Sequence, residues 1–415
     1  MITDVQALLI NLLNPTRDRE DTAEVLPSLT AEDWQLIQPY VESHSLANLV
    51  FARLRQQELL GLIPEENRVL MRENYLANAA RNSFLLNSAQ KAFAVLAARG
   101  IPVIGLKGLY LLENVFKDVG ARAMNDLDIL VQKQDIASAL SALKSISCEP
   151  LSYFDSNAAN LDIKHVPPMS LPDGTTIEIH WTLLEENEPF NINPESLWQR
   201  SVPARFADMD ARALSTEDLL LHLCLHATYQ HYLKLGLRGM FDLALVLQKE
   251  AERIDWDKLS RTARDWGVEK IAALSLALLQ EIDWVQLPDK LPDGLKPAAL
   301  DAEFVTQAKS LFLLENHNPS ALTPDLAELS ASESLLEKGN LILRRIFLPK
   351  AVIARLYNIN PRSPGIVLGY FRRVFDLVQQ HGGTFTKLFN SDQELTQNME
   401  QEKIRYQIHQ WLTSR

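Results

Sequence analysis

A short acidic segment, residues 125–131 (NDLDILV), constrains the fold of this chain more than any other stretch. In a β-strand, residues two apart project from the same face, so Asp126 and Asp128 would lie side by side while Leu127 and Ile129 face a core. Two adjacent negative charges are unfavourable unless a cation neutralises them, and Mg²⁺ typically binds one or two carboxylates together with substrate phosphates. The alternative is an Asp-rich turn before an ordinary strand, with both side chains solvated.

The residues before this segment predict a phosphate-binding turn. Residues 101–106 (IPVIGL) form an apolar run of the length of a buried strand, which ends at Lys107 and Gly108. A strand that leads into a helix N-terminus is a natural binding corner for phosphate. We expect short helices over 109–116 and 134–145, so that the order strand, helix, strand, helix predicts a core of α/β texture.

A predicted β-hairpin supplies a third carboxylate. Asp173 and Gly174 are typical of a two-residue hairpin turn, and residues 175–181 (TTIEIHW) after it alternate between polar and apolar. Glu178 and His180 therefore share one face of this strand. Near the acidic segment they would complete a metal site, whereas Glu178 considered alone would be a solvated residue on an outer face.

Helical patterns flank this core. Residues 64–99 have apolar residues at helical spacing and no Gly or Pro after the start, and Thr30 is a predicted N-cap. After Ser215, two histidines four residues apart, His222 and His226, share a helix face. A helical zinc site is one interpretation of this pair, although the glutamate of a metalloprotease motif is missing. The other is that His226 lines a pocket or makes a buried hydrogen bond.

Further along, Arg238 and Asp242 are spaced as an i,i+4 ion pair. Taken alone, they would form a surface salt bridge of less than about 1 kcal/mol. Residues 366–380 predict a later helix, which we expect to end at Gly382 and Gly383.

Composition limits the classes of protein to consider. The 415 residues, 47% hydrophobic and 23% charged, are typical of a globular protein of two or three domains. No apolar run is long enough to span a membrane, the N-terminus does not resemble a signal peptide, and Cys148 and Cys224 lie far apart, so we expect a cytoplasmic protein. The net charge of −12 disfavours stable nucleic-acid binding, although residues 338–415 hold 12 Lys and Arg against 5 Asp and Glu.

These patterns predict an α+β fold, in which a small mixed β-sheet core has helical regions on both sides of it in the sequence. We expect four parts: a helical cap (1–95), an α/β core (96–214), a helical domain that closes the site (215–335) and a basic helical C-terminal region (336–415). Three carboxylates can hold two divalent ions, which together clamp a triphosphate and activate an acceptor oxygen for in-line attack. The residues alone therefore predict metal-dependent chemistry on a phosphate ester.

The ordered segments IPVIGLKGLYLLENVF, ARAMNDLDILV, HVPPMSLPDGTTIEIHW and LLLHLCLHATYQHYLKLGLRGMFDLALVL resemble a bacterial family, the uncharacterised nucleotidyltransferases, which have the polymerase-β-type superfold. The resemblance covers residues 95–250, and more loosely the helices up to residue 375. It implies that Asp126 and Asp128 are paired catalytic metal ligands and that Glu178 is the third carboxylate.

The resemblance also implies a nucleotide site. Lys107 and Gly108 stand at the family's nucleotide-binding turn, and Arg122 would face the phosphates. The histidines of the hairpin match as well, His180 near the nucleotide and His165 as a pocket residue. The matching residues of the helical half, which would close over the nucleotide, are His226, Arg238 and Asp242.

The function implied is a magnesium-dependent transfer of a nucleoside monophosphate from an NTP, with ATP expected, to a small-molecule or protein acceptor. Two Mg²⁺ ions are expected, with Mn²⁺ as a substitute. The alternative is a catalytically degenerate nucleotide-binding or scaffold protein of the same fold. The observation behind it is that better-understood nucleotidyltransferases place Gly-Ser at the phosphate turn, where this chain has Lys107-Gly108-Leu109 without a hydroxyl. The sequence does not indicate the acceptor, the base preference, the oligomeric state or the role of the basic C-terminal region.

Overall fold

The computed structural model describes residues 4–151, 164–313, 343, 347–360, 363–389 and 393–414. The described residues fall into two compact units. The first contains 4–149 and 164–313, and nearly all of the second lies beyond residue 342. The first unit therefore includes the sheet and the helices on both sides of it in the sequence.

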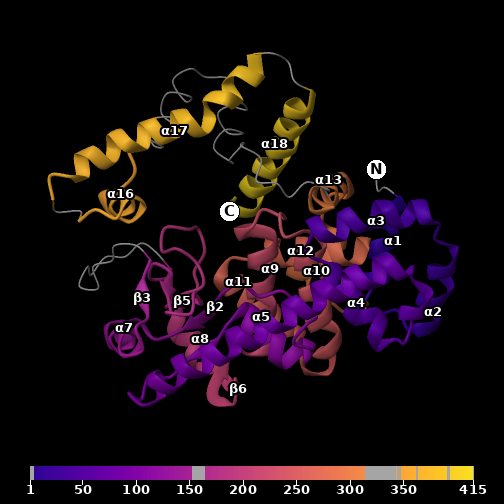
Figure 1. Ribbon diagram of the computed structural model, residues 1–415, viewed down its shortest axis with the longest axis horizontal. Coiled ribbons are helices and arrows are strands. Elements are labelled where there is room, and N and C mark those ends of the chain that lie inside the picture. Colours follow the sequence, from indigo (N-terminus) through magenta and orange to yellow (C-terminus); the bar gives the residue numbers. More distant parts are fainter. Residues whose placement is uncertain are drawn as a thin grey trace. The chain divides into compact units, whose positions relative to one another are not determined.

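The first unit begins with helices whose ends are set by local sequence. Thr30 caps α3 and forms a capping box with Asp33, as predicted. The long helix α5 has no Gly or Pro in its interior, and it packs against α4 and α7 and against β6 and β7 (Figure 1). The helices are α1 (Asp4–Leu13), α2 (Arg19–Val25), α3 (Ala31–Ser43), α4 (Ala47–Gln56) and α5 (Glu65–Ala97).

The core is one mixed sheet of seven strands, in the order β3-β4-β5-β2-β1-β7-β6. β2 runs parallel to β5 and antiparallel to β1, and β1 runs parallel to β7. The predicted α+β fold is therefore confirmed. The strands are β1 (Ile104–Gly105), β2 (Leu127–Leu130), β3 (Glu149–Pro150), β4 (Met169–Ser170), β5 (Thr176–His180), β6 (Val202–Phe206) and β7 (Met209–Ala213).

The register of the central strands sets the position of the site. β2 and β5 lie side by side with Asp128 opposite Glu178, which aligns the two carboxylate-bearing positions. The backbone N–H of Leu106 donates to the carbonyl of Asp128 at 3.0 Å, which holds the end of β1 against β2. Leu106 is also the N-cap of α6 (Lys107–Tyr110), which continues into the π-helical turn η3 (Leu111–Phe116), so the expected helix over 109–116 begins two residues earlier.

The hairpin forms at the predicted place, but the predicted two-residue turn is wrong. The backbone N–H of Leu171 donates to the carbonyl of Thr175, so the loop consists of the three residues 172–174. Gly174 has a φ of +84°, a conformation that favours glycine, and β4 and β5 pair antiparallel around it. Within β5, Ile177 and Ile179 are fully buried, whereas Thr176 and Glu178 are only partly buried, so the predicted alternation is confirmed at these positions.

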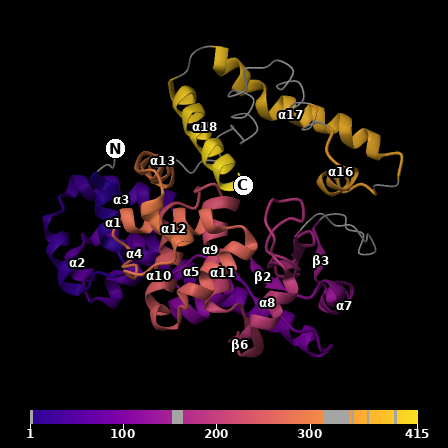
Figure 2. The same cartoon turned by 180° about the vertical axis from the view of Figure 1, so that it is seen from behind.

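Helices complete the first unit (Figure 2). Ser215 caps α9 by accepting a hydrogen bond from the N–H of Asp218, as expected. α10, α11 and α12 pack against α9. Trp284, just after α12, donates from its indole N–H to the carbonyl of Ile10 at 2.8 Å, which joins this region to α1. The helices are α7 (Ile136–Lys144), α8 (Pro194–Arg200), α9 (Thr216–Cys224), η5 (Leu225–Gln230), α10 (Gly236–Lys249), α11 (Trp256–Trp266), α12 (Glu269–Glu281) and α13 (Ala302–Phe312).

The second unit contains the helices α16 (Lys350–Tyr357), α17 (Ile366–Phe389) and α18 (Gln393–Thr413). The predicted end of α17 at Gly382 and Gly383 is wrong, because the helix continues through both glycines to residue 389. Glycine lowers helix stability by only about 1 kcal/mol, so a glycine pair does not by itself end a long helix. Within the described ranges, no helix is both long enough and apolar enough to cross a bilayer.

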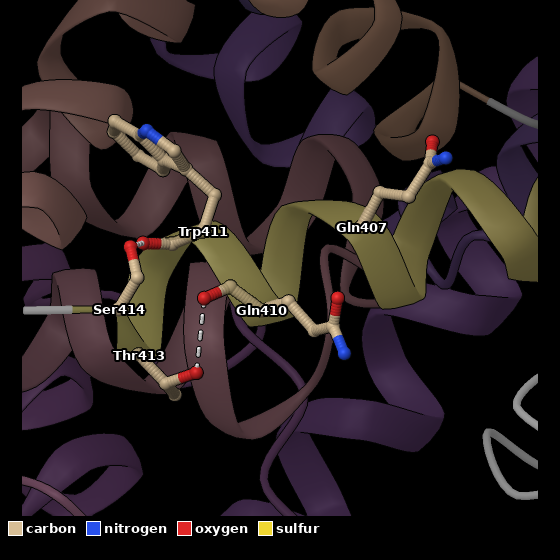
Figure 3. A pocket seen from close by; sticks show the side chains of 5 residues that line it. All are labelled: Gln407, Gln410, Trp411, Thr413 and Ser414. Carbon is tan, nitrogen blue, oxygen red and sulfur yellow. Dashed lines mark hydrogen bonds between the residues drawn. The ribbon is translucent and has the colours of Figure 1, made fainter.

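The C-terminal part of α18 lines a pocket (Figure 3). The hydroxyl of Thr413 donates to the carbonyl of Gln410 at 3.1 Å, inside the helix itself. The lining side chains carry no carboxylate or ammonium group, so this pocket differs in chemistry from the acidic region of the sheet. They are Gln407, Gln410, Trp411, Thr413 and Ser414.

Candidate active site

The acidic segment lies at the start of the central strand β2. Asp128 is within the strand and 5% exposed. Asp126 lies one residue before the strand, because pairing with β5 starts at Leu127. The expectation that both aspartates lie within one strand is therefore wrong for Asp126, whose direction is set by a bend and not by strand alternation.

Asp128 is held by two nitrogen donors. Its Oδ1 accepts hydrogen bonds from Lys107 Nζ at 3.0 Å and from His180 Nε2 at 2.9 Å. Burial alone would raise the pKa of this carboxyl, but Lys107 and His180 reverse the effect and hold the pKa well below its ordinary value. Asp128 is therefore a stable carboxylate and remains ionised over the physiological pH range.

Glu178 and His180 project from β5 toward Asp128. His180 Nε2 lies 3.4 Å from Glu178 Oε2, and this hydrogen bond lowers the pKa of Glu178. Asp128, Glu178 and His180 each offer one ligand atom, and these three atoms lie within 4.8 Å of one another. Among the described residues, these three side chains form the group that could hold a metal ion. Two ionised carboxylates and an imidazole fit a divalent cation, since carboxylate oxygens suit Mg²⁺ and Mn²⁺ and imidazole is also a ligand for transition metals.

Asp126 has a different electrostatic environment from Asp128. Its pKa is raised to about 6, first by burial and then by the negative charges of Asp128 and Glu178. Lys107 and Arg122 offset part of this effect. The three predicted carboxylates therefore influence one another electrostatically, and Asp126 carries the unfavourable charge that a cation would relieve.

Lys107 and Gly108 begin the first turn of α6, just after β1. Lys107 is the first residue of α6 and has a φ of +37°, which is strained for a residue other than glycine. Gly108 packs against Arg122, because an added Cβ would lie 3.0 Å from Arg122 Nη1. The turn therefore lies beside both the acidic pair and the arginine that precedes it.

Arg122 forms a buried ion pair with Asp242 of α10. Its Nε and Nη2 donate to the two carboxylate oxygens of Asp242 at 2.8–3.1 Å, in a bidentate arrangement. The interpretation of Asp242 as half of a surface salt bridge with Arg238 is wrong, since Asp242 is buried and its ion-pair partner is 120 residues away in the sequence. Arg238 is itself partly buried, and burial followed by the charge of Arg122 lowers its pKa.

Three asparagines support the segment that leads to Arg122. The carboxamides of Asn48, Asn78 and Asn82 donate five hydrogen bonds of 2.7–3.3 Å to carbonyl groups within residues 119–122. Sequence reasoning missed these residues. The available signal was the i,i+4 spacing of Asn78 and Asn82 in a long helix, where asparagine is an unfavourable residue and its side chain needs a partner.

Four further histidines lie in this half of the unit. Burial lowers the pKa of each, and for His231 the value falls to about 4, so these imidazoles are neutral at neutral pH. His165 pairs with His180 through a β-bridge, and its ring lies 5.0 Å from that of His180. His222 and His226 have ring centroids 6.5 Å apart, and the ligand cluster found within the described ranges contains neither of them. The zinc interpretation therefore has no support from these residues.

A mixed sheet that brings carboxylates from two adjacent strands together beside a cationic turn defines a class of fold and site, that of the nucleotidyltransferases. A family model described as uncharacterised nucleotidyltransferase matches residues 30–282. The chain belongs to this family, and the predicted resemblance is confirmed. The match begins before α3 and therefore includes most of the N-terminal helices as well as the sheet.

Among solved structures, the chain is similar to the antibiotic-resistance factor ANT(2'')-Ia. The alignment covers 44% of this chain and 92% of that protein, with 12% sequence identity and a TM-score of 0.33. A comparison with curated protein sequences found no match.

Proposed function

We propose that this protein is a divalent-metal-dependent nucleotidyltransferase that moves a nucleoside monophosphate from an NTP, with ATP expected, to a small-molecule or protein acceptor. The observation that carries the proposal is the pairing of Asp128 with Glu178 across β2 and β5, with Lys107 and His180 on the same carboxylate oxygen. Membership of the family supports the class of reaction.

In this proposal, the carboxylates and Lys107 have different roles. Asp126, Asp128 and Glu178 would hold Mg²⁺, or Mn²⁺ in its place. When bound, the metal supplies charge neutralisation of the triphosphate and polarisation of the acceptor oxygen. Lys107 would bind the phosphates from the turn, in the place of the hydroxyl that other nucleotidyltransferases use.

The chemistry is an in-line displacement. The acceptor oxygen forms a bond to the α-phosphorus, the bond from that phosphorus to the bridging oxygen of the β-phosphate breaks, and pyrophosphate leaves. The acceptor hydroxyl gives its proton to solvent. Protein groups in this reaction position the reactants and stabilise charge, since phosphoryl-type transfers need little covalent participation from the enzyme.

Incubation with α-³²P-labelled NTPs and Mg²⁺ or Mn²⁺ tests the proposal, with pyrophosphate release measured in parallel. We expect label transfer to an acceptor from a cell extract and its loss in Asp128→Asn. If Asp128→Asn binds metal and nucleotide as tightly as the wild type, the assignment of this metal ligand fails.

A second candidate function is nucleotide binding without turnover. The contact of Lys107 with Asp128 favours it, because the ammonium group pairs with the carboxylate that catalysis would need. Tight NTP binding without pyrophosphate release, with every acceptor fraction tested, would select this candidate over the transferase.

A further inference from the structure

Lys107 and His180 contact the same carboxylate oxygen of Asp128, one of the residues proposed to hold the metal. Asp128 Oδ1 already accepts from Lys107 Nζ at 3.0 Å and from His180 Nε2 at 2.9 Å, and a carboxylate oxygen has two lone pairs. Both members of the ion pair are shielded from water, with side-chain exposures of 13% for Lys107 and 7% for Asp128. A cation that bound this oxygen would have to displace one donor, and the ammonium is the donor that repels it.

The charge of Lys107 reaches across the whole site. It lowers the pKa values of Asp126 and Asp128, and after burial it is the largest influence that lowers those of His222, His226 and His231. Its ammonium therefore acts electrostatically on the carboxylates and on the histidines from α9, η5 and the turn that follows, while its direct contact is with Asp128. A lysine has a flexible four-carbon stem, so the ammonium can move by rotation of the side chain while the strained backbone at the start of α6 stays in place.

We propose that Lys107 is an exchangeable counter-ion that couples metal binding to nucleotide binding. Without ligand, its ammonium neutralises Asp128. When metal and nucleotide arrive together, the ammonium moves from Asp128 to the triphosphate, and the carboxylate becomes a metal ligand. Metal alone therefore binds weakly, because it must displace Lys107 with no phosphate to receive the ammonium. This inference rests on the proposed function and concerns the regulation of the same site.

The proposal predicts opposite effects of one substitution. In Lys107→Met, the affinity for Mn²⁺ alone should rise by about 5–150-fold, the usual range of coupling between sites. Affinity for a non-hydrolysable α,β-methylene ATP analogue at saturating Mn²⁺ should fall, because the phosphate contact is lost. Lys107→Gln keeps an N–H donor without the charge and should behave like Lys107→Met, whereas Lys107→Arg keeps the charge and should resemble the wild type.

Lys164 offers a matched control. Like Lys107 it is largely buried, and its pKa is lowered by burial and by the charge of Lys107, so it lies in the same electrostatic environment. Among the described residues it makes no ion pair within 4.0 Å. Lys164→Met therefore removes an equal charge without removing a contact with Asp128, and it should raise the affinity for Mn²⁺ alone much less than Lys107→Met does.

The affinity for Mn²⁺ alone is measured by electron paramagnetic resonance of free Mn²⁺ during titration of the full chain without nucleotide. The affinity for the nucleotide analogue at saturating Mn²⁺ is measured with a fluorescent form of that analogue. Unchanged or weaker Mn²⁺ binding in Lys107→Met and Lys107→Gln, or an equal gain in Lys164→Met, would overturn the exchange while leaving the proposed function intact. If neither the wild type nor any variant binds Mn²⁺ with or without nucleotide, the exchange and the proposed function both fail.

Discussion

Asp126 and Asp128 should respond in opposite directions to the same isosteric substitution. The raised pKa of Asp126, about 6 against an ordinary 3.8, means that its charge destabilises the metal-free fold. A difference of about 2 pKa units corresponds to at most about 3 kcal/mol, since each unit is worth about 1.4 kcal/mol. Because Asp126 is only partly buried, we expect Asp126→Asn to stabilise the metal-free protein by about 1–2 kcal/mol at pH 7.

Asp128→Asn should destabilise the same protein. The substitution leaves the Lys107 ammonium without the carboxylate that it contacts and replaces the acceptor of His180 by a neutral amide. Removal of one partner from a buried ion pair typically costs about 3–5 kcal/mol. Two aspartates separated by one residue should therefore differ in the sign of their effect on unfolding.

The pH dependence of the unfolding free energy separates the contribution of Asp126 from that of Asp128. The folded state holds the Asp126 proton more tightly than the unfolded state does, so the wild type loses stability from this group as pH rises from about 4 to about 6. The advantage of Asp126→Asn should accordingly be absent below pH 4, grow between pH 4 and 6, and stay constant above. The contribution of Asp128 has the opposite sign: it is present above pH 4 and lost as pH falls through its lowered pKa.

Thermal unfolding in EDTA, followed by scanning fluorimetry from pH 4 to 8, is a suitable assay. For a unit of this size, 1 kcal/mol shifts the midpoint by on the order of 1–3 °C. A lower midpoint for Asp126→Asn at pH 7, or a gain that persists undiminished at pH 4, would refute the electrostatic reasoning. Saturating Mn²⁺ should reverse the order of the wild type and Asp126→Asn, because the metal needs the charge.

Three further substitutions test the support of the site. Asn82→Ala removes two hydrogen bonds from a fully buried carboxamide and should destabilise the protein by about 2–3 kcal/mol in urea unfolding, with weaker Mn²⁺–nucleotide binding. Arg122→Lys cannot reproduce the bidentate contact with its buried carboxylate partner, so we expect a lower melting midpoint although the charge is kept. Gly120→Ala would place a Cβ in steric conflict with the ring of Tyr75 and should lower the midpoint by several degrees, whereas Gly61→Ala, whose Cβ meets no described atom within 4 Å, should leave it nearly unchanged.

Local sequence patterns predicted the parts of the fold that local forces determine. Thr30 and Ser215 cap helices as expected, since a side-chain oxygen three residues before a free N–H decides the helix start. The alternation in β5 placed Glu178 correctly relative to the buried isoleucines, because strand geometry has a period of two. The same reasoning failed for Asp126, since the end of a strand depends on where its neighbour stops pairing, and that neighbour lies 50 residues away.

The contacts that the sequence did not predict join residues distant in the chain. Asp242 has the correct spacing for Arg238 but binds Arg122, and nothing within α10 indicates this choice. The preference follows from burial: Arg122 needs a carboxylate in the interior, because an unpaired buried guanidinium is far more costly than an exposed one. Spacing along a helix shows which side chains can contact one another, whereas tertiary packing determines which of these contacts form.

The N-terminal helices have a role in the site that their sequence alone does not suggest. Residues 119–122 have carbonyl groups that point toward α4 and α5, and the carboxamides of Asn48, Asn78 and Asn82 satisfy them. A carboxamide suits this task because it donates hydrogen bonds to carbonyls without adding charge beside an already acidic site. The conformation of the segment that carries Arg122 to the start of β2 is therefore held from outside the sheet. The family match, which begins at residue 30 and so includes α4 and α5, is consistent with helices and sheet forming one functional unit.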